Sequence, residues 1–138
     1  SEISIFLKKN DGICLFIDYG YLYGYGNTLQ AIKNHKFVNP LRHPGVSDLT
    51  AHINFSHIIK EANNLGMNFF GTSTQRNFLL KLGALERLEI LKKSASSEKI
   101  KFEIEEGLNR VIENSQMGEL FKVCAISPKN KLIPEGFD

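Results

Sequence analysis

Three glycines follow an apolar run near the start of the chain, in the stretch GICLFIDYGYLYGYGNTLQAI at residues 12–32. A strand, a glycine-rich turn and a helix are the parts of a phosphate or nucleoside site, because glycines let backbone amides approach the ligand. The spacing here is G-x-x-x-G-x-G, and Tyr21, Tyr23 and Tyr25 alternate through the turn. Since a cradle needs small residues, the match to a cofactor-binding loop is poor.

Three histidines and an aspartate, His35, His43, His52 and Asp48, could be drawn together as a metal cluster. Zinc sites use close pairs such as C-x-x-C or H-x-x-x-H, and the sequence has neither. We therefore expect no metal. Asp48, Thr50 and His52 are better explained as residues whose hydrogen bonds hold a long loop, since a buried loop must satisfy its backbone groups.

Asp18 and Tyr19 close an apolar run that is typical of a buried strand. Open α/β sheets bind ligands beyond the carboxyl ends of their strands, so both residues are candidates for a site. Asp18 could equally cap a local turn. The loop tyrosines could stack on a peptide or an adenine, or pack against their own domain. The residues alone leave both pairs of alternatives open.

Composition limits the classes of protein that fit. A chain of 138 residues, 42% of them hydrophobic, builds one ordinary core and hence one domain. The net charge of +2 includes no basic block, so no nucleic-acid partner is expected. With no long apolar run and no basic leader, neither a membrane partner nor a signal peptide is expected. Cys14 and Cys124 lie in apolar runs, which favours reduced thiols and a cytoplasmic protein.

The elements that must position these residues follow from the apolar periodicity. In the first half, the sequence predicts a helix at residues 2–9, a strand at 13–18, an irregular segment at 19–51 with a turn or two of helix at 28–34, an Asn54-capped helix ending at Gly66, and a strand at 67–71. A segment as long as 19–51 without regular structure is usually functional or disordered.

The second half is predicted to be mainly helical. A capping-box spacing, Thr72-x-x-Gln75, begins a helix that ends at Gly83, and helices at 85–93 and 96–113 follow. Residues 119–127, ELFKVCAIS, are predicted to form the last strand. Because helical chain joins strand 13–18 to the next strand, the two are expected to be parallel neighbours with a right-handed connection.

Several segments in order along the chain resemble one known family. They are IDYGY, GNTLQAIKNHKFVNPL, HPGVSDLTAHINFS, STQRNFLLKLG, MGELFKVCAI and PEGF. Together they resemble the C-terminal half of the MidA-like S-adenosylmethionine-dependent methyltransferases, a family that includes a mitochondrial arginine methyltransferase of complex I assembly. The usual acids of two family motifs, GDTL and DF, are the amides Asn27 and Asn54 here.

This resemblance implies an α/β fold, the C-terminal portion of a seven-stranded Rossmann-like methyltransferase. Residues 1–138 would form a single partial domain with strands five to seven and a helical insertion, and residues 19–51 would be a family-specific inserted loop. The family holds its cofactor on strands one and two, which precede everything here. S-adenosylmethionine is therefore expected in the complete enzyme, and no cofactor is expected for this chain alone, which would be a fragment or the product of a truncated or split gene.

The resemblance also implies partners and roles. The expected partners are a protein substrate such as a respiratory complex I subunit, a separate N-terminal half, and further copies of the chain. These copies would be joined through the edge at residues 13–18 or by exchange of the N-terminal helix. The implied catalytic residues are Asp18, Tyr19 and His52, and the implied substrate-binding residues are His35, Asp48 and Thr50. The implied function is the C-terminal part of a protein-arginine methyltransferase, inactive alone. The alternatives are a non-catalytic assembly or scaffolding module and a small nucleotide-binding domain that uses the glycine loop.

Overall fold

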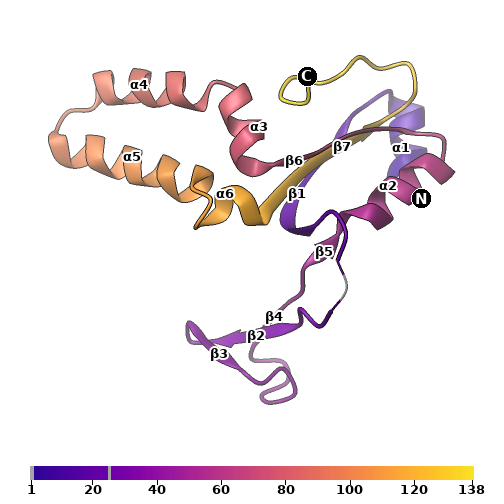
Figure 1. The fold of residues 1–138 in the computed structure, drawn as a ribbon, viewed down its shortest axis with the longest axis horizontal. Helices are drawn as coiled ribbons and strands as arrows, with labels where there is room; N and C mark the ends of the chain where they lie inside the picture. Colours follow the sequence, from indigo (N-terminus) through magenta and orange to yellow (C-terminus); the bar gives the residue numbers. More distant parts are fainter. Residues whose placement is uncertain (1, 25) are drawn as a thin grey trace.

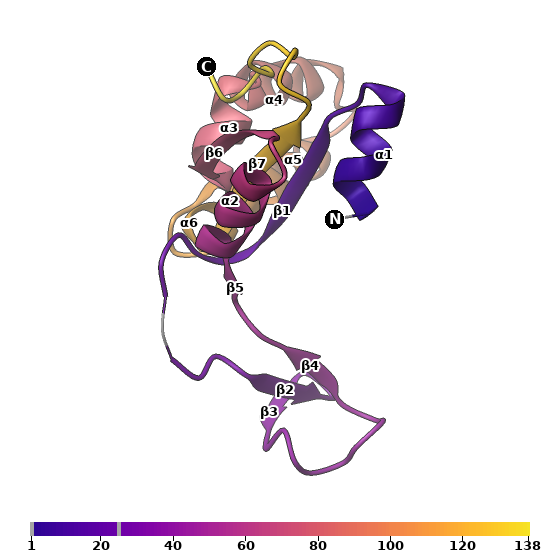
Figure 2. The same ribbon diagram turned by 90° about the vertical axis from the view of Figure 1, so that its right-hand side faces the viewer.

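Two sheets organise the chain in the computed structural model, which describes residues 2–24 and 26–138 (Figure 1). The main sheet has the strand order β5-β1-β7-β6. Its strands are β1 (Cys14–Tyr21), β5 (Ile53–Asn54), β6 (Asn68–Thr74) and β7 (Phe121–Ser127). The second sheet, of three short strands, lies beyond the end of β1, away from the main sheet (Figure 2).

The last strand of the chain lies in the middle of the main sheet. β7 pairs antiparallel with β1 on one side and antiparallel with β6 on the other. The expectation that the first two long strands are parallel neighbours is therefore wrong: β1 and β6 run in the same direction, but β7 separates them. A helical connection between two strands makes them run in the same direction, but a later strand of the chain can still insert between them. Val123–Ser127 of β7 are all buried.

One face of the main sheet carries the core. Helices α1 (Glu2–Asn10) and α2 (Phe55–Asn64) supply Leu7 and Ala62, which pack with Met67 and Ile126. The side chains of β1 alternate, so Cys14 and Phe16 join this core while Leu15 and Ile17 point to the other face and are 46% and 47% exposed. The prediction of a buried strand therefore holds for one face of β1 only, because the other face leaves apolar side chains exposed.

The segment at residues 19–51 is more regular than its sequence suggests. It holds β2 (Gln30–Lys33), β3 (Lys36–Val38) and β4 (Asp48–Thr50), in the order β3-β2-β4, where helical turns at 28–34 were expected. Asn34 and His35 both have positive φ, 50° and 59°, and form the two-residue turn of a tight hairpin between β2 and β3. The prediction missed this turn because it contains no glycine.

Four helices separate β6 from β7. They are α3 (Gln75–Lys81), α4 (Ala84–Ser94), α5 (Glu98–Ile112) and α6 (Met117–Leu120). Thr74 rather than Thr72 caps α3, because the Thr74 hydroxyl oxygen accepts from the Asn77 amide at 3.1 Å. The predicted Asn54 cap of α2 is confirmed. Within the part of the chain that the structure describes, the helices are too short or too polar to cross a bilayer.

Candidate functional site

A cavity of about 290 Å³ lies at the carboxyl end of β1, between the two sheets. Its lining comes from the main sheet, from α6 and from the second sheet: Tyr19, Gln30, Ile32, Thr50, His52, Leu120 and Phe121. Residues from three parts of the chain converge here because β5 returns to pair with β1, with Gly20 opposite Ile53. The carboxyl edge of the sheet is where α/β proteins bind ligands.

Aromatic rings form the centre of this site. The ring of Tyr19 meets the rings of His52 and Phe121 edge-on, at centroid distances of 5.6 and 5.4 Å. Tyr21 lies on the same side of β1 as Tyr19, and its ring is 4.9 Å from that of His52. The Tyr21 hydroxyl and His52 Nδ1 share a hydrogen bond of 2.5 Å. Together these side chains offer flat apolar faces with a hydroxyl and an imidazole among them.

Backbone contacts fix His52 in this position. The His52 amide donates to the Thr28 hydroxyl oxygen at 3.0 Å, which joins the GNTL and DLTAH segments. Asn54 Nδ2 donates to the Gly24 carbonyl at 3.3 Å, and Asn54 Oδ1 accepts from the Ser56 amide at 3.1 Å. An aspartate could accept from Ser56 and could not donate to Gly24. The amide at position 54 therefore has a structural use that the family's usual acid would not serve.

Two of the three loop glycines, Gly20 and Gly24, make close contacts within the protein. A Cβ on Gly20 would lie 2.1 Å from the Ile53 carbonyl oxygen, and one on Gly24 would lie 2.6 Å from the Tyr21 ring. These two glycines let β5 approach β1 and let the loop pack on Tyr21. Because protein atoms already occupy the space that each glycine provides, neither position is free to cradle a cofactor.

The structure brings together only some of the residues predicted for the site. Tyr19, Thr50 and His52 line one cavity. Asp18 points to the other face of β1, and its Oδ1 accepts from the Tyr19 amide at 2.8 Å. Because β1 continues to Tyr21, Asp18 lies within the strand, where it neither lines the cavity nor caps a turn. His35 and Asp48 are exposed on the second sheet, outside the cavity lining.

A metal cluster was also considered for these residues. Among residues 2–24 and 26–138, no group of three or more His, Cys, Asp or Glu side chains is placed to hold a metal ion. Sequence reasoning did not select Phe121, Gln30 or Ile32. The alternation of Tyr19 and Tyr21 along a strand was a signal that Tyr21 shares a face with Tyr19. No local signal linked Phe121 to Tyr19, since 102 positions separate them, and only their pairing across β1 and β7 reveals it.

These features define an α/β protein with the last part of a Rossmann-like methyltransferase sheet, in which an antiparallel strand lies between two strands of one direction. Its sequence matches, over residues 1–73, the family described as "Putative S-adenosyl-L-methionine-dependent methyltransferase". The chain belongs to this family, and the resemblance seen in the sequence is confirmed.

Relatives and solved structures agree with this assignment. The chain is 31% identical over 129 residues to protein arginine methyltransferase NDUFAF7 of Xenopus tropicalis, covering 91% of this chain and 29% of that protein. It is 35% identical over 120 residues to the Caenorhabditis elegans homologue, covering 86% and 27%. A "likely methyl transferase" from Burkholderia thailandensis bound to S-adenosyl-homocysteine matches with TM-score 0.81 and 28% identity, covering 97% of this chain and 38% of that chain. The chain thus spans under a third of these curated relatives and about two fifths of the solved structure.

The relatives correct the expected localisation. The Xenopus, Caenorhabditis and Drosophila proteins are all labelled mitochondrial, which contradicts the cytoplasmic localisation inferred from the cysteines. The inference failed because a reducing environment keeps thiols free without identifying the compartment. Both cysteines are free in the structure, as expected.

Proposed function

We propose that this chain is the C-terminal part of an S-adenosylmethionine-dependent protein-arginine methyltransferase and forms the substrate side of its active site. The observation that carries the proposal is the Tyr19–His52–Phe121 cavity at the carboxyl end of β1 in a member of a methyltransferase family. Relatives named protein arginine methyltransferases support arginine as the target. In this proposal residues 1–138 are one partial domain, and residues 19–51 are an insertion into it.

The lining of the cavity suits a guanidinium group. A guanidinium is flat and weakly hydrated, and it stacks on aromatic faces such as those of Tyr19 and Phe121. Its N–H groups need acceptors, which the Thr50 hydroxyl and the Gln30 amide oxygen can provide. The attacking nitrogen must lose a proton, and the imidazole of His52, whose Nδ1 is hydrogen-bonded to the Tyr21 hydroxyl, would accept it on Nε2.

The other predicted residues take different places in this proposal. Tyr19 and His52 touch the substrate, and Asp18 acts through Tyr19 as a positioning residue, because its carboxylate holds the Tyr19 backbone amide. Thr50 binds the substrate inside the cavity. Asp48 and His35 bind it outside the cavity, on the second sheet.

The described residues do not form a binding site for S-adenosylmethionine, the methyl donor. Gly20 and Gly24 already face protein atoms, and no carboxylate lines the cavity to bind a ribose. We therefore propose that the chain alone binds no S-adenosylmethionine and is inactive without an N-terminal part that holds it. Such an N-terminal part could also pair with the open edge of β1. Before Gly20, no described strand pairs with the edge of β1 opposite β7.

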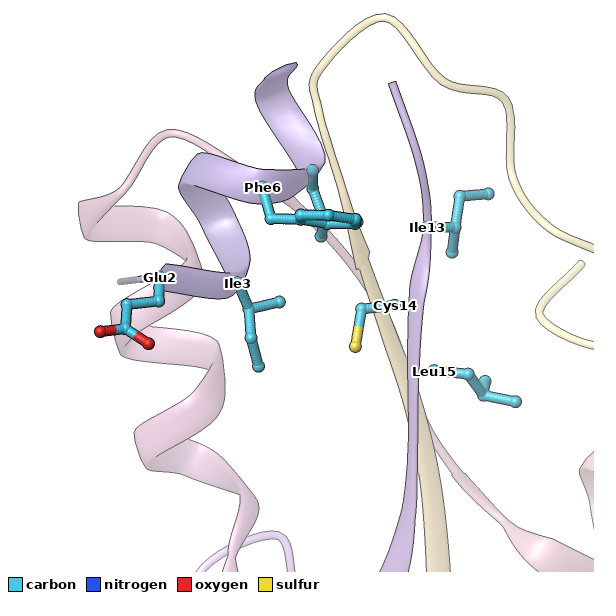
Figure 3. A pocket seen from close by; sticks show the side chains of 7 residues that line it. Glu2, Ile3, Phe6, Ile13, Cys14 and Leu15 are labelled. Carbon is cyan, nitrogen blue, oxygen red and sulfur yellow. The ribbon is translucent and has the colours of Figure 1, made fainter. Parts of the chain in front are cut away.

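A groove of about 520 Å³ lies beside this free edge (Figure 3). Ile3 and Phe6 of α1 and Ile13, Cys14 and Leu15 of β1 line it. Cys14 points toward α1 and Ile13 and Leu15 point away from it, so the groove extends around the edge of the strand. Such an edge and its apolar surroundings are a template for another strand. We propose that the N-terminal part covers it in the enzyme, and that in its absence two copies of this chain cover each other.

A chimera tests the proposed function. This chain would replace the matching C-terminal part of the Caenorhabditis relative, and transfer of labelled methyl groups to arginine of a protein substrate would be measured. We expect the chimera to methylate and to lose most activity on His52→Gln, and the chain alone to show neither transfer nor calorimetric binding of S-adenosylmethionine. A folded chimera that binds S-adenosylmethionine without transferring methyl groups would overturn the proposal and favour the assembly module.

A further inference from the structure

We propose that the second sheet is a docking surface for an extended segment of the protein substrate, and that it selects an arginine with acidic neighbours. We call this surface the arm and define it as residues 28–50, which include β2, β3 and β4. The inference rests on the proposed function, since it deepens the substrate side of the same site. It concerns binding that precedes any chemistry, so it can be tested separately.

The arm and the cavity share one continuous face. Gln30, Ile32 and Thr50 of the arm line the cavity. Phe37 of β3 lies directly opposite Ile32 in the antiparallel register, so both side chains stand on the same face of the arm. Phe37 is nevertheless 74% exposed. A polypeptide whose arginine occupies the cavity would therefore extend across Ile32 onto Phe37, which offers a large apolar contact.

The arm also has a free backbone edge. β3 pairs with β2 on one side, and no described strand pairs with Lys36–Val38 on the other. An extended peptide can add to such an edge through main-chain hydrogen bonds, while alternate side chains reach the face below. Because Phe37 belongs to this same edge strand, one peptide could form main-chain hydrogen bonds with β3 and contact the exposed Phe37 ring.

The charge of the arm decides which peptide fits. No acidic residue occurs between Asp18 and Asp48, and the arm carries Lys33, Lys36 and Arg42 against the single carboxylate of Asp48. The arm therefore has a net charge equal to the +2 of the whole chain.

Lys33 and Lys36 lie opposite each other in the register, so alternation places them on the face of the arm away from Ile32 and Phe37. A peptide strand added to the β3 edge turns alternate side chains to the two faces, so acidic residues on one face would meet these lysines while apolar residues on the other contact Phe37. An arginine substrate without such acidic residues is itself cationic and would be repelled.

An anionic lipid surface is the competing occupant. Exposed apolar groups flanked by cations also occur on proteins that bind membrane surfaces, and Leu41 in the β3–β4 loop is 89% exposed. The peptide is favoured because Phe37 lies on the face that continues into the cavity, an arrangement that a lipid surface would not require.

Fluorescence anisotropy of labelled peptides with this chain tests the proposal. One peptide carries an arginine between acidic residues and a phenylalanine, and its matched partners replace the acids by serine or by lysine. We expect the acidic peptide to bind about tenfold or more tightly than the serine peptide at low salt, with the difference shrinking as salt screens the charges. Vesicles of phosphatidylglycerol and of phosphatidylcholine are tested alongside.

Two variants and one control locate the surface. Lys33→Glu with Lys36→Glu should remove or reverse the preference for acids, and Phe37→Ser should weaken all peptides alike. Lys99→Glu with Lys101→Glu makes the same change of charge on α5 and should change nothing. Circular dichroism shows whether each variant is folded. A preference for acids that the arm variants leave intact, or that the α5 control also abolishes, would overturn the proposal.

The remaining outcomes separate the two proposals. Binding to phosphatidylglycerol vesicles that depends on Phe37 and exceeds binding to every peptide would also overturn the docking of a peptide, and would assign the arm to a lipid surface. Arm-dependent binding of acidic arginine peptides together with an inactive chimera would mean that the inference stands and the proposed function fails. An active chimera whose arm binds acidic, neutral and basic peptides equally well would mean that the proposed function stands and the inference fails.

Discussion

The hydroxyl of Tyr21 and Nδ1 of His52 share a hydrogen bond that joins the last residue of β1 to the residue before β5. Thirty-one positions separate the two residues in the sequence. The contact matters because His52 belongs to the segment that leaves the arm and re-enters the main sheet. The orientation of the imidazole in the candidate site therefore depends on Tyr21 as well as on the Thr28 hydroxyl that accepts from the His52 amide.

Removing this hydrogen bond should cost little stability and more function. Tyr21→Phe keeps the ring and is expected to lower the free energy of unfolding by about 0.5–1 kcal/mol, because the bond is exposed to solvent. Urea denaturation measures the loss. In the chimera, the same change should lower kcat more than it raises KM, since it disturbs His52, the proposed proton acceptor. Tyr23→Phe, at a ring that is 73% exposed, is the control and should change neither quantity.

Gly20 should tolerate no side chain. Gly20→Ala places a Cβ 2.1 Å from the Ile53 carbonyl oxygen, so β5 must move away from β1. We expect a loss of about 1–3 kcal/mol in the free energy of unfolding. Gly107 in α5, where a Cβ would meet nothing within 4 Å, provides the control. Gly107→Ala should raise stability by about 0.5–1 kcal/mol, because alanine favours a helix interior. Equal effects at the two glycines would contradict the close approach of β5.

The amide of Asn54 should matter for the loop before the arm more than for α2. Asn54→Asp keeps the acceptor that caps α2 and loses the donor to the Gly24 carbonyl. We expect the amides of residues 22–24 to exchange hydrogen faster, while the amides of α2 stay protected. Asn54→Ala removes both contacts and should lower stability by about 1 kcal/mol through the cap alone. Unchanged exchange at residues 22–24 in Asn54→Asp would show that the Gly24 contact does not hold the loop.

The buried thiol of Cys124 should make the fold sensitive to alkali. Burial raises the pKa of Cys124 to about 12, and the nearby Cys14 thiol adds to the shift. A folded-state pKa above the unfolded value of about 8.5 means that the unfolded chain loses its proton first. Stability is then complete below about pH 8.5 and falls as pH rises toward 12. Cys124→Ala should show a shallower fall between pH 9 and 11 in urea titrations; a parallel fall would contradict this.

The limits of sequence reasoning are visible in individual residues. The helix capped by Asn54 could be foreseen, because caps leave local patterns. Tyr19 and His52 could each be selected as candidate site residues, but the contact between their rings was not predicted. The arm could not be foreseen, since strands of three or four residues show almost no alternation and the turn at Asn34-His35 lacks glycine. The contact of Phe121 with Tyr19 depends on β7 lying next to β1, and a strand's choice of neighbour is not written in its own periodicity.

The exposed face of β1 gives the last prediction, which concerns self-association. Ile13, Leu15 and Ile17 are each about half exposed on one side of β1, whose edge before Gly20 pairs with no strand in the described part of the chain. Water-exposed apolar patches and unpaired strand edges favour pairing with another chain. Light scattering of the isolated chain should therefore show a dimer or a higher oligomer. Leu15→Lys with Ile17→Lys should convert it to a monomer, because charges on this face oppose its burial.

Matched lysine substitutions on other elements distinguish association through β1 from non-specific hydrophobic association. Ile90, 57% exposed on α4, and Phe102, 65% exposed on α5, are the other apolar positions to replace by lysine. These changes should leave the oligomer intact if β1 forms the interface. In the chimera we propose that the N-terminal part covers β1, so Leu15→Lys should there lower the melting temperature instead of changing the mass. A wild-type chain that stays monomeric at high concentration would show that the free edge and face of β1 do not drive association.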